Sequence, residues 1–309
     1  MLTHEENELV CRTGPGTPMG DLFRRFWLPV ALAEEVPGPD CDPVRVEVLS
    51  EKLILFKDSS GRPGLVDAYC PHRGAPMFYG RNEEDGLRCV YHGWKFDVSG
   101  ACTDLPNAPE GETFKNKVTI NAYPAAEKGG AIWVYMGPKE KQPPLPGYRF
   151  MDLPATHRYT WKMHIECNYF QSLEGDIDTS HVNFLHFNLD KAETTTVPGE
   201  QMPGMRGAFR SLMWRDASPK LEVVDTDYGV VYTAKRDQGD GNEYHRIHPF
   251  IFPFHTMIGG SIDEKNMLTS YNGKAWVPMD DNNTLILEWQ LRPAKPWSDE
   301  ERAQLLKVR

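Results

Sequence analysis

Short apolar runs separated by turn residues dominate the chain between residues 44 and 136. The runs are VRVEVLS, KLILFKD and PGLVDAY, followed from residue 117 by KVTINAYPAAE and GAIWVYM. Runs of this length, rich in β-branched and aromatic residues and bounded by Gly, Pro, Asp and Ser, are typical of β-strands. They predict a compact antiparallel β domain with an insertion near residues 70–100.

The segments that flank this β region have a different pattern. Thr17 followed by Pro18 matches a helix N-cap with proline at the first helical position, which predicts a short helix over residues 21–26. The stretch GPKEKQPPLPGYRFMDLP is rich in Pro and Gly and predicts a domain boundary. We therefore predict an N-terminal helical segment that packs on the rest, residues 1–40, and two domains, residues 41–150 and 151–309.

The second domain opens with TWKMHIECNYFQSLEGDIDTSHVNFLHF, which contains no proline and is predicted to be largely helical. The strands predicted after it are FRSLMWRD, KLEVVDTD, GVVYTAKR, YHRIHPFIF, LTSYNGKAWVP and TLILEWQLRP. Ser298 is predicted to cap a final helix, SDEERAQLLKVR, which has acidic residues in its first turn. The predicted fold class is α+β.

Composition and charge exclude several classes of partner. The 309 residues carry a net charge of −10, from 34 basic and 44 acidic side chains, and an acidic surface disfavours nucleic acid and anionic membranes. No apolar run approaches the roughly 18 residues that span a bilayer, and the acidic N-terminus does not resemble a secretory signal. Six cysteines are too few for a disulfide scaffold, so we expect a protein of the reducing cytoplasm.

Two Cys–His pairs form the first candidate metal constellation. One residue separates Cys70 from His72, two separate Cys89 from His92, and sixteen lie between the pairs. Two thiolates and two imidazoles suit either a zinc ion or a Rieske [2Fe–2S] cluster, in which the cysteines hold one iron and the histidines the other. Zinc fingers usually pair Cys with Cys and His with His, so the mixed pairs favour the cluster.

A second constellation, at the start of the second domain, consists of Glu174, Asp178, His181 and His186. Two histidines with a carboxylate are the usual ligands of a non-heme Fe(II) that activates O2. Two histidines on an amphipathic segment, taken alone, more often bind no metal. The first three residues would share one helix face, whereas residues five apart point roughly 140° away from each other. The helix is therefore expected to break or distort between residues 182 and 185.

Both constellations resemble motifs of one family. The runs CPHRGAP from Cys70 and CVYHGWKF from Cys89 resemble the Rieske signature of bacterial aromatic-ring-hydroxylating oxygenases. The run CNYFQSLEGDIDTSHVNFLH resembles the mononuclear-iron motif of the same family, in the form of its phthalate dioxygenase-like branch. The resemblance implies an antiparallel β Rieske domain with a [2Fe–2S] cluster, joined to a helix-grip catalytic domain with an antiparallel sheet and a mononuclear Fe(II) held by His181 and His186.

The resemblance also implies an activity and partners. The chain would be the oxygenase component of an enzyme that uses O2, and electrons from NAD(P)H through a separate reductase, to hydroxylate an aromatic compound. The alternative is O-demethylation of a methoxylated aromatic acid. Because family members form head-to-tail trimers, we expect a homotrimer or a higher multiple. Asp178 would then bridge His181 and His92 of the partner subunit.

The chain departs from this family in its length. Members are longer, and their third iron ligand, an Asp or Glu, would fall beyond Arg309, so we expect the chain to be incomplete at its C-terminus. Asp280 and Asp281 are better explained as part of a turn between two strands. Two other hypotheses remain open: an electron carrier of the Rieske ferredoxin type, which the motif at residues 174–186 argues against, and an inactive fragment.

An aromatic carboxylate as substrate would need a cation in the pocket. Arg246 and Arg210 lie in predicted strands of the catalytic domain and are the candidates. The alternative for each of them is an arginine that is solvated or paired in a salt bridge.

Overall fold

The computed structural model describes residues 2–109, 111–185, 212–213, 215–239, 241–259 and 269–307. The chain divides into two compact units. The first consists of Met1–Asp152, Thr160–Phe170 and Val277–Leu287, and the second of Leu153–Tyr159, Gln171–Trp276 and Glu288–Arg309. The domain boundaries after residues 40 and 150 stay predictions.

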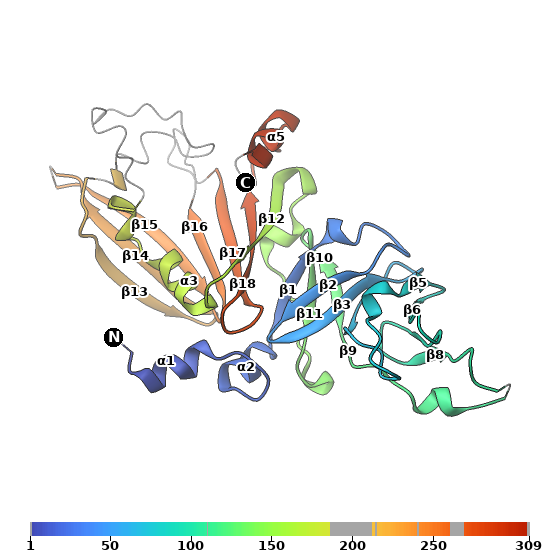
Figure 1. Ribbon diagram of the computed structural model, residues 1–309. Helices are drawn as coiled ribbons and strands as arrows, with labels where there is room; N and C mark the ends of the chain where they lie inside the picture. The colour runs from blue at the N-terminus through green and yellow to red at the C-terminus, as the bar shows by residue number, and fades with distance from the viewer. Residues whose placement is uncertain are drawn as a thin grey trace. The chain divides into compact units, whose positions relative to one another are not determined.

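Three small antiparallel sheets build the first unit (Figure 1). The first has the order β2 (Val44–Val48), β3 (Glu51–Lys57), β4 (Pro63–Asp67) and β9 (Ala122–Tyr123). The second has the order β1 (Trp27–Leu32), β11 (Ala131–Tyr135) and β10 (Ala125–Lys128). The third has the order β5 (Arg81–Glu83), β6 (Gly86–Arg88), β7 (Lys95–Phe96) and β8 (Cys102–Asp104). This third sheet forms the predicted insertion, and the antiparallel β domain is confirmed.

Helices α1 (His4–Cys11) and α2 (Pro18–Phe23) precede these sheets. The predicted cap is confirmed, because the Thr17 side chain accepts a hydrogen bond from Gly20 N, 3.1 Å away, and Pro18 follows it. The segment predicted as helical over residues 1–40 contains these two helices but is not helical throughout, since β1 also lies within it. Proline disfavours regular strands, but β1 is an edge strand and its register shifts between Pro29 and Ala31, which accommodates Pro29.

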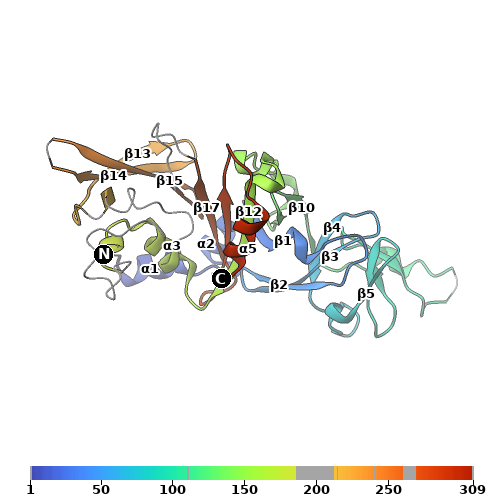
Figure 2. The ribbon, with the colours of Figure 1, turned by 90° about the horizontal axis from the view of Figure 1, so that it is seen from above.

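A larger sheet has seven strands in the order β12-β18-β17-β16-β15-β14-β13. Their bounds are β12 (Arg158–Ile165), β13 (Lys220–Thr226), β14 (Gly229–Asp237), β15 (Glu243–Ile251), β16 (His255–Gly259), β17 (Tyr271–Pro278) and β18 (Thr284–Leu291). Helix α3 (Tyr169–Ile177) lies against one face of it on the side of β14 and β15 (Figures 1 and 2). Helix α5 (Asp299–Lys307) follows β18, and the expected cap is confirmed, because Ser298 Oγ accepts from Glu301 N.

Short 3-10 helices connect several of these elements. They cover Ala33–Glu35, Met77–Tyr79, Phe114–Lys117, Lys139–Lys141, Arg149–Asp152, Ala155–His157 and His181–Asn183. None of the helices in the described ranges is long and apolar enough to cross a membrane.

Two predictions for the second part of the chain are wrong. The opening segment is not largely helical, because β12 occupies its first residues. Its sequence RYTWKMHI mixes β-branched, aromatic and polar residues in near alternation, which suits a strand more than a helix. The strand predicted over residues 209–216 is also wrong where it is described, since Leu212 and Met213 are helical. Strand β16 was not predicted. The α+β class is confirmed.

Candidate metal centres

Two loops with the same backbone closure carry the first constellation. In the loop of residues 70–75, Cys70 N donates to Ala75 O at 2.8 Å and Gly74 N donates to Cys70 O at 2.9 Å. In the loop of residues 89–94, between β6 and β7, Cys89 N donates to Trp94 O at 2.8 Å and Gly93 N donates to Cys89 O at 3.0 Å. Each loop thus begins at a cysteine and turns at the glycine four residues later.

The two glycines are required by the backbone. Gly74 has a φ of +67° and Gly93 a φ of +80°, in the left-handed region that other residues rarely adopt. A side chain at Gly93 would also place its Cβ 2.5 Å from Cγ of Pro106, whereas nothing lies within 4 Å of the same position at Gly74. The second loop is therefore packed more tightly than the first.

The four predicted ligands come together as a cysteine pair and a histidine pair. Cys70 and Cys89 are both buried free thiols, and burial together with the neighbouring Cys89 raises the pKa of Cys70. The half-buried rings of His72 and His92 lie with their centroids 4.6 Å apart. Burial, and then His92, lower the pKa of His72, the direction that favours the neutral ring.

This arrangement fits a [2Fe–2S] cluster. A Rieske cluster takes two thiolates on one iron and two neutral imidazoles on the other, so it needs two pairs of donors and not four around one point. In the described part of the chain, no three His, Cys, Asp or Glu side chains gather as a site for a single ion. The donor types and their grouping in pairs are those that the cluster requires.

Trp94 connects the two loops. Its indole stacks on the His72 ring with the centroids 4.2 Å and the planes 6° apart, although Trp94 belongs to the other loop. Its Nε1 donates to Asn107 Oδ1 at 3.0 Å, which helps to hold the indole in place. Trp94 therefore packs over the loop that carries His72.

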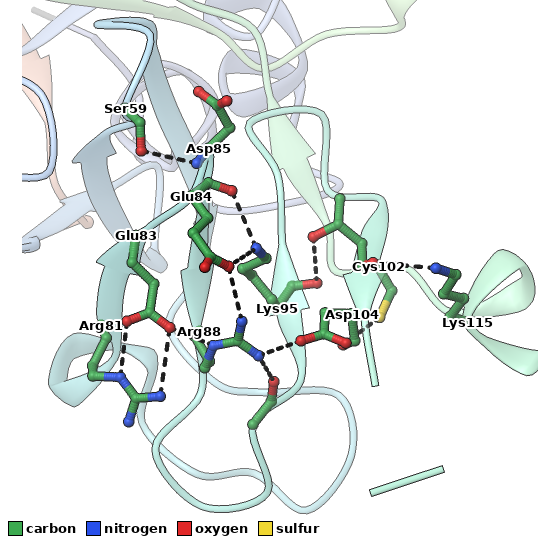
Figure 3. A network of polar contacts seen from close by, with 12 residues as sticks. Ser59, Arg81, Glu83, Glu84, Asp85, Arg88, Lys95, Cys102, Asp104 and Lys115 are labelled. Carbon is green, nitrogen blue, oxygen red and sulfur yellow. Dashed lines mark hydrogen bonds and ion pairs between the residues drawn. The ribbon is translucent and has the colours of Figure 1, made fainter. Parts of the chain in front are cut away.

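A buried arginine that the sequence analysis missed supports the second loop (Figure 3). Arg88, the residue before Cys89, donates to Gly93 O at 2.8 Å, to Asp104 Oδ2 at 2.6 Å and to Glu83 Oε1 at 2.5 Å. It thereby joins the loop to β5 and β8. A charged residue in the otherwise apolar strand directly before a ligand cysteine was the signal available in the sequence.

The second constellation lies where α3 ends. The helix stops at Ile177, and a 3-10 turn begins at His181. Between them, Asp178 Oδ2 lies 3.5 Å from His181 Nδ1, and Asp178 Oδ1 accepts from Ser180 N at 2.7 Å. The predicted break in the helix is present, but it precedes His181 and does not fall between residues 182 and 185. Asp178 and His181 therefore meet across a turn and not along a shared helix face.

Of the remaining residues considered for the site, some are described by the structure and some are not. His186 and Arg210 lie outside the described residues. The turn assigned to Asp280 and Asp281 is confirmed, because Asp280 Oδ1 accepts from Asn282 N at 2.7 Å and Asp281 Oδ1 accepts from Thr13 N at 2.9 Å.

Arg246 is buried on the face of β15 that also carries Tyr244 and His248. On the neighbouring strand β14, Tyr232 pairs with His248 and Arg236 pairs with Tyr244. Burial lowers the pKa of Arg246, which is the direction expected for a cation removed from water. Of the two alternatives for Arg246, the solvated arginine is therefore wrong, and the arginine paired in a salt bridge stays open.

Comparisons with known proteins agree with this organisation. A family model described as Rieske [2Fe-2S] domain matches residues 26–124, and one described as LigXa C-terminal domain like matches residues 134–302. The 3-chlorobenzoate-3,4-dioxygenase oxygenase subunit of Comamonas testosteroni is 39% identical over 93% of this chain and 63% of its own length. The phthalate 4,5-dioxygenase oxygenase subunit of Pseudomonas putida is 37% identical over 92% of this chain and 63% of its own length.

One further relative and one solved structure extend the comparison. The 5,5'-dehydrodivanillate O-demethylase oxygenase subunit of Sphingobium sp. (strain NBRC 103272 / SYK-6) is 34% identical over 97% of this chain and 66% of its own length. The crystal structure of dicamba monooxygenase bound to dicamba superposes with a TM-score of 0.70 over 92% of this chain and 81% of that one, at 19% identity, which supports the fold alone.

The chain spans 63–66% of the length of these three curated relatives. Within that span, the two family models follow each other along the chain, and the matched loops of the Rieske domain lie inside the first of them. The resemblance stated from the motifs is confirmed. The chain belongs to the Rieske non-heme iron oxygenase family and resembles its phthalate dioxygenase-like branch.

Proposed function

We propose that the full-length protein is the oxygenase component of a cytoplasmic enzyme that hydroxylates an aromatic compound, namely an aromatic carboxylate. It would use O2 and electrons that a separate reductase takes from NAD(P)H. The observation that carries this proposal is the pairing of Cys70 with Cys89 and of His72 with His92 in a domain that is followed by the Asp178–His181 contact. The oxygenase-subunit relatives support it.

In this proposal Cys70, His72, Cys89 and His92 hold the [2Fe–2S] cluster. His181 and His186 hold a mononuclear Fe(II) together with a carboxylate ligand. When bound, the cluster supplies single electrons and the iron supplies the site of O2 activation. His181 is suited to its role because Asp178 faces its Nδ1, which orients the ring and leaves Nε2 for a metal.

Electron transfer is proposed to cross between subunits of a homotrimer or a higher multiple. Asp178 would accept a hydrogen bond from His181 and another from His92 of the partner subunit. Its side chain is suited to such a bridge because it is about half exposed, at 48%, while it faces His181. A carboxylate already enclosed by its own chain would have no surface left for a second subunit.

Arg246 is proposed to bind the carboxylate of the substrate, with Arg210 as the second candidate. A buried guanidinium beside aromatic side chains offers both the charge and the apolar wall that an aromatic acid requires. Tyr232 and Tyr244, on the same face of the sheet, supply this wall. The relatives named for 3-chlorobenzoate and phthalate support an aromatic acid as the substrate class.

O-demethylation of a methoxylated aromatic acid is the second candidate function. The relative named as a 5,5'-dehydrodivanillate O-demethylase oxygenase subunit favours it, at 34% identity over 97% of the chain. The two reactions use the same metals and differ in the substrate group that lies beside the iron. They are therefore distinguished by the products and not by the cofactors.

The test is oxygen uptake by the full-length protein with a surrogate reductase and NADH. 3-Chlorobenzoate, phthalate and a methoxylated benzoate are added in turn, and the products are identified. We expect uptake that depends on one of the acids, with a hydroxylated product, or with formaldehyde if the second function holds. A cluster that the reductase reduces, without uptake stimulated by any acid in a broad panel, would instead indicate an electron carrier.

A further inference from the structure

The short connector of residues 178–180 joins the end of α3 to the 3-10 turn that begins at His181. It starts with Asp178, so its path sets how Asp178 and His181 face each other. The last carbonyl groups of a helix have no partner within the helix and carry partial negative charge. Something outside α3 must satisfy these carbonyls if the connector is to hold one conformation.

Two side chains of one strand bind this region. On β14, Tyr232 Oη donates to Ile177 O at 2.5 Å, and Arg236 Nη2 donates to Thr179 O at 2.8 Å and to Thr179 Oγ1 at 3.1 Å. Residues four apart on a strand point to the same face, so both side chains rise from β14 toward α3. They fix the backbone on both sides of Asp178.

Arg236 is an unusual residue in this position because it is fully buried, at 0% exposure. Its Nε donates to Asp216 O at 3.2 Å and its Nη2 donates to Thr179, whereas its buried Nη1 has no hydrogen-bond partner among the described residues. Within the described ranges no carboxylate forms an ion pair with it. A buried cation is unfavourable unless it is well hydrogen-bonded. Here its charge lies at the negative end of a helix, where a cation is stabilising.

We propose that Arg236, assisted by Tyr232, is a positioning residue for the mononuclear metal site. It touches neither metal nor substrate, and it acts through Thr179 to hold Asp178 against His181. This proposal rests on the proposed function, because the position of Asp178 against His181 affects a metal site only if His181 is a metal ligand. It adds a residue of strand β14 that the ligand motif itself does not contain.

The test measures Co²⁺ affinity in the full-length protein from which the mononuclear iron has been removed and in which the cluster remains. Arg236→Gln is expected to weaken Co²⁺ binding about 10-fold, the lower end of the effect of losing a residue that supports a ligand. Tyr232→Phe should weaken it less, since it removes one bond, and Arg236→Lys should restore part of the affinity. The visible spectrum of the cluster should not change in any of them.

Two matched variants of the same strand serve as controls. Ala234 is buried on the same face between Tyr232 and Arg236, so Ala234→Gly lowers stability without removing a contact to the connector. Lys235 lies on the opposite face and pairs with Glu222, so Lys235→Gln removes a charge from β14 elsewhere. Both should keep the wild-type Co²⁺ affinity within about twofold, a difference of about 0.4 kcal/mol.

The outcomes separate the two proposals. If the wild-type protein binds no Co²⁺, the proposed function fails and this inference with it. If the wild type binds and a folded Arg236→Gln variant binds equally well, only the inference is overturned. If Arg236→Gln does not fold, Thr179→Val decides, because it removes only the hydroxyl acceptor of Arg236: weaker binding supports the inference, and unchanged affinity of both this variant and Tyr232→Phe overturns it.

Discussion

Asp178 Oδ2 lies 3.5 Å from His181 Nδ1, across the turn that follows α3. Contact between a carboxylate and the second nitrogen of a histidine is the usual way in which proteins orient a histidine that binds a metal through its other nitrogen. The structure reaches this contact by ending the helix early. The relationship leads directly to the first prediction.

Asp178→Asn should slow electron transfer to the mononuclear site by about 10–100-fold or more, because it removes a charged partner of His181. Single-turnover rates with the cluster reduced in advance measure this effect, after both metals have been quantified. Asp227→Asn is the matched control, since Asp227 lies exposed in the turn between β13 and β14. Wild-type transfer in a fully loaded Asp178→Asn variant would remove Asp178 from the mechanism.

Gly93→Ala should destabilise the first unit, which contains the two cluster loops, more than Gly74→Ala does. A residue other than glycine in the left-handed region costs about 1–2 kcal/mol, and this penalty applies at both positions. Only at Gly93 does the new Cβ meet the Pro106 ring, 2.5 Å away, which adds about 1–3 kcal/mol of overpacking. Thermal unfolding and cluster content measure the difference, and equal losses in the two variants would show that the loops are equally tolerant.

Arg246→Gln should raise KM for an aromatic acid about 10–100-fold, because a hydrogen bond to a charged group contributes about 1.5–3 kcal/mol. Arg246→Lys should recover part of this loss, since it keeps the charge without the planar pair of donors. Both variants are compared at equal metal content. An unchanged KM in the glutamine variant would mean that the carboxylate binds elsewhere.

Stability should fall as the pH is lowered from 6.5, because His248 is buried in the neutral form. Burial, and then the nearby Arg246 and Arg236, lower its pKa to about 3. Between pH 6.5 and about 3, the unfolded chain binds a proton that the folded chain does not, so unfolding becomes easier as the pH falls. The slope is about 1.4 kcal/mol per pH unit for one such histidine.

Urea unfolding at pH 7.5 and pH 5.5 measures this slope. His248→Gln should be less dependent on pH than the wild type, even though it is less stable at pH 7.5. His255, whose pKa burial also lowers to about 3, should keep its own contribution. His245→Gln is the control, because His245 is exposed on the same strand and should leave the slope unchanged. An equal slope in His248→Gln would contradict the assignment.

The sequence predicted most of the strands and both metal motifs, because these depend on local patterns. The strands β2, β3, β4 and β11 are apolar runs bounded by turn residues, and the two Cys–His pairs are short fixed spacings. The failures depended on tertiary context. Strand β1 was not predicted because it contains Pro29, and a strand tolerates proline only at an edge position or a bulge. The absence of proline suggested a helix where β12 forms.

The position of the break in α3 could not be read from spacing. Helical periodicity placed Asp178 and His181 on one face, but contacts from β14, far along the chain, hold the backbone beyond Ile177. Arg88 and Arg236 were missed for the same reason. Each is a charged residue in a strand, and its role is defined by the backbone carbonyl groups that it reaches after folding.

The midpoint reduction potential of the iron–sulfur cluster in the full-length protein tests the central claim most directly. Two neutral imidazoles in place of two thiolates raise the potential to about −150 to +300 mV, compared with about −400 mV for a plant-type ferredoxin cluster with four thiolates. The pairing of His72 with His92 beside Cys70 and Cys89 predicts a value in the higher range. A potential near −400 mV, or a colourless protein that holds stoichiometric zinc, would contradict it.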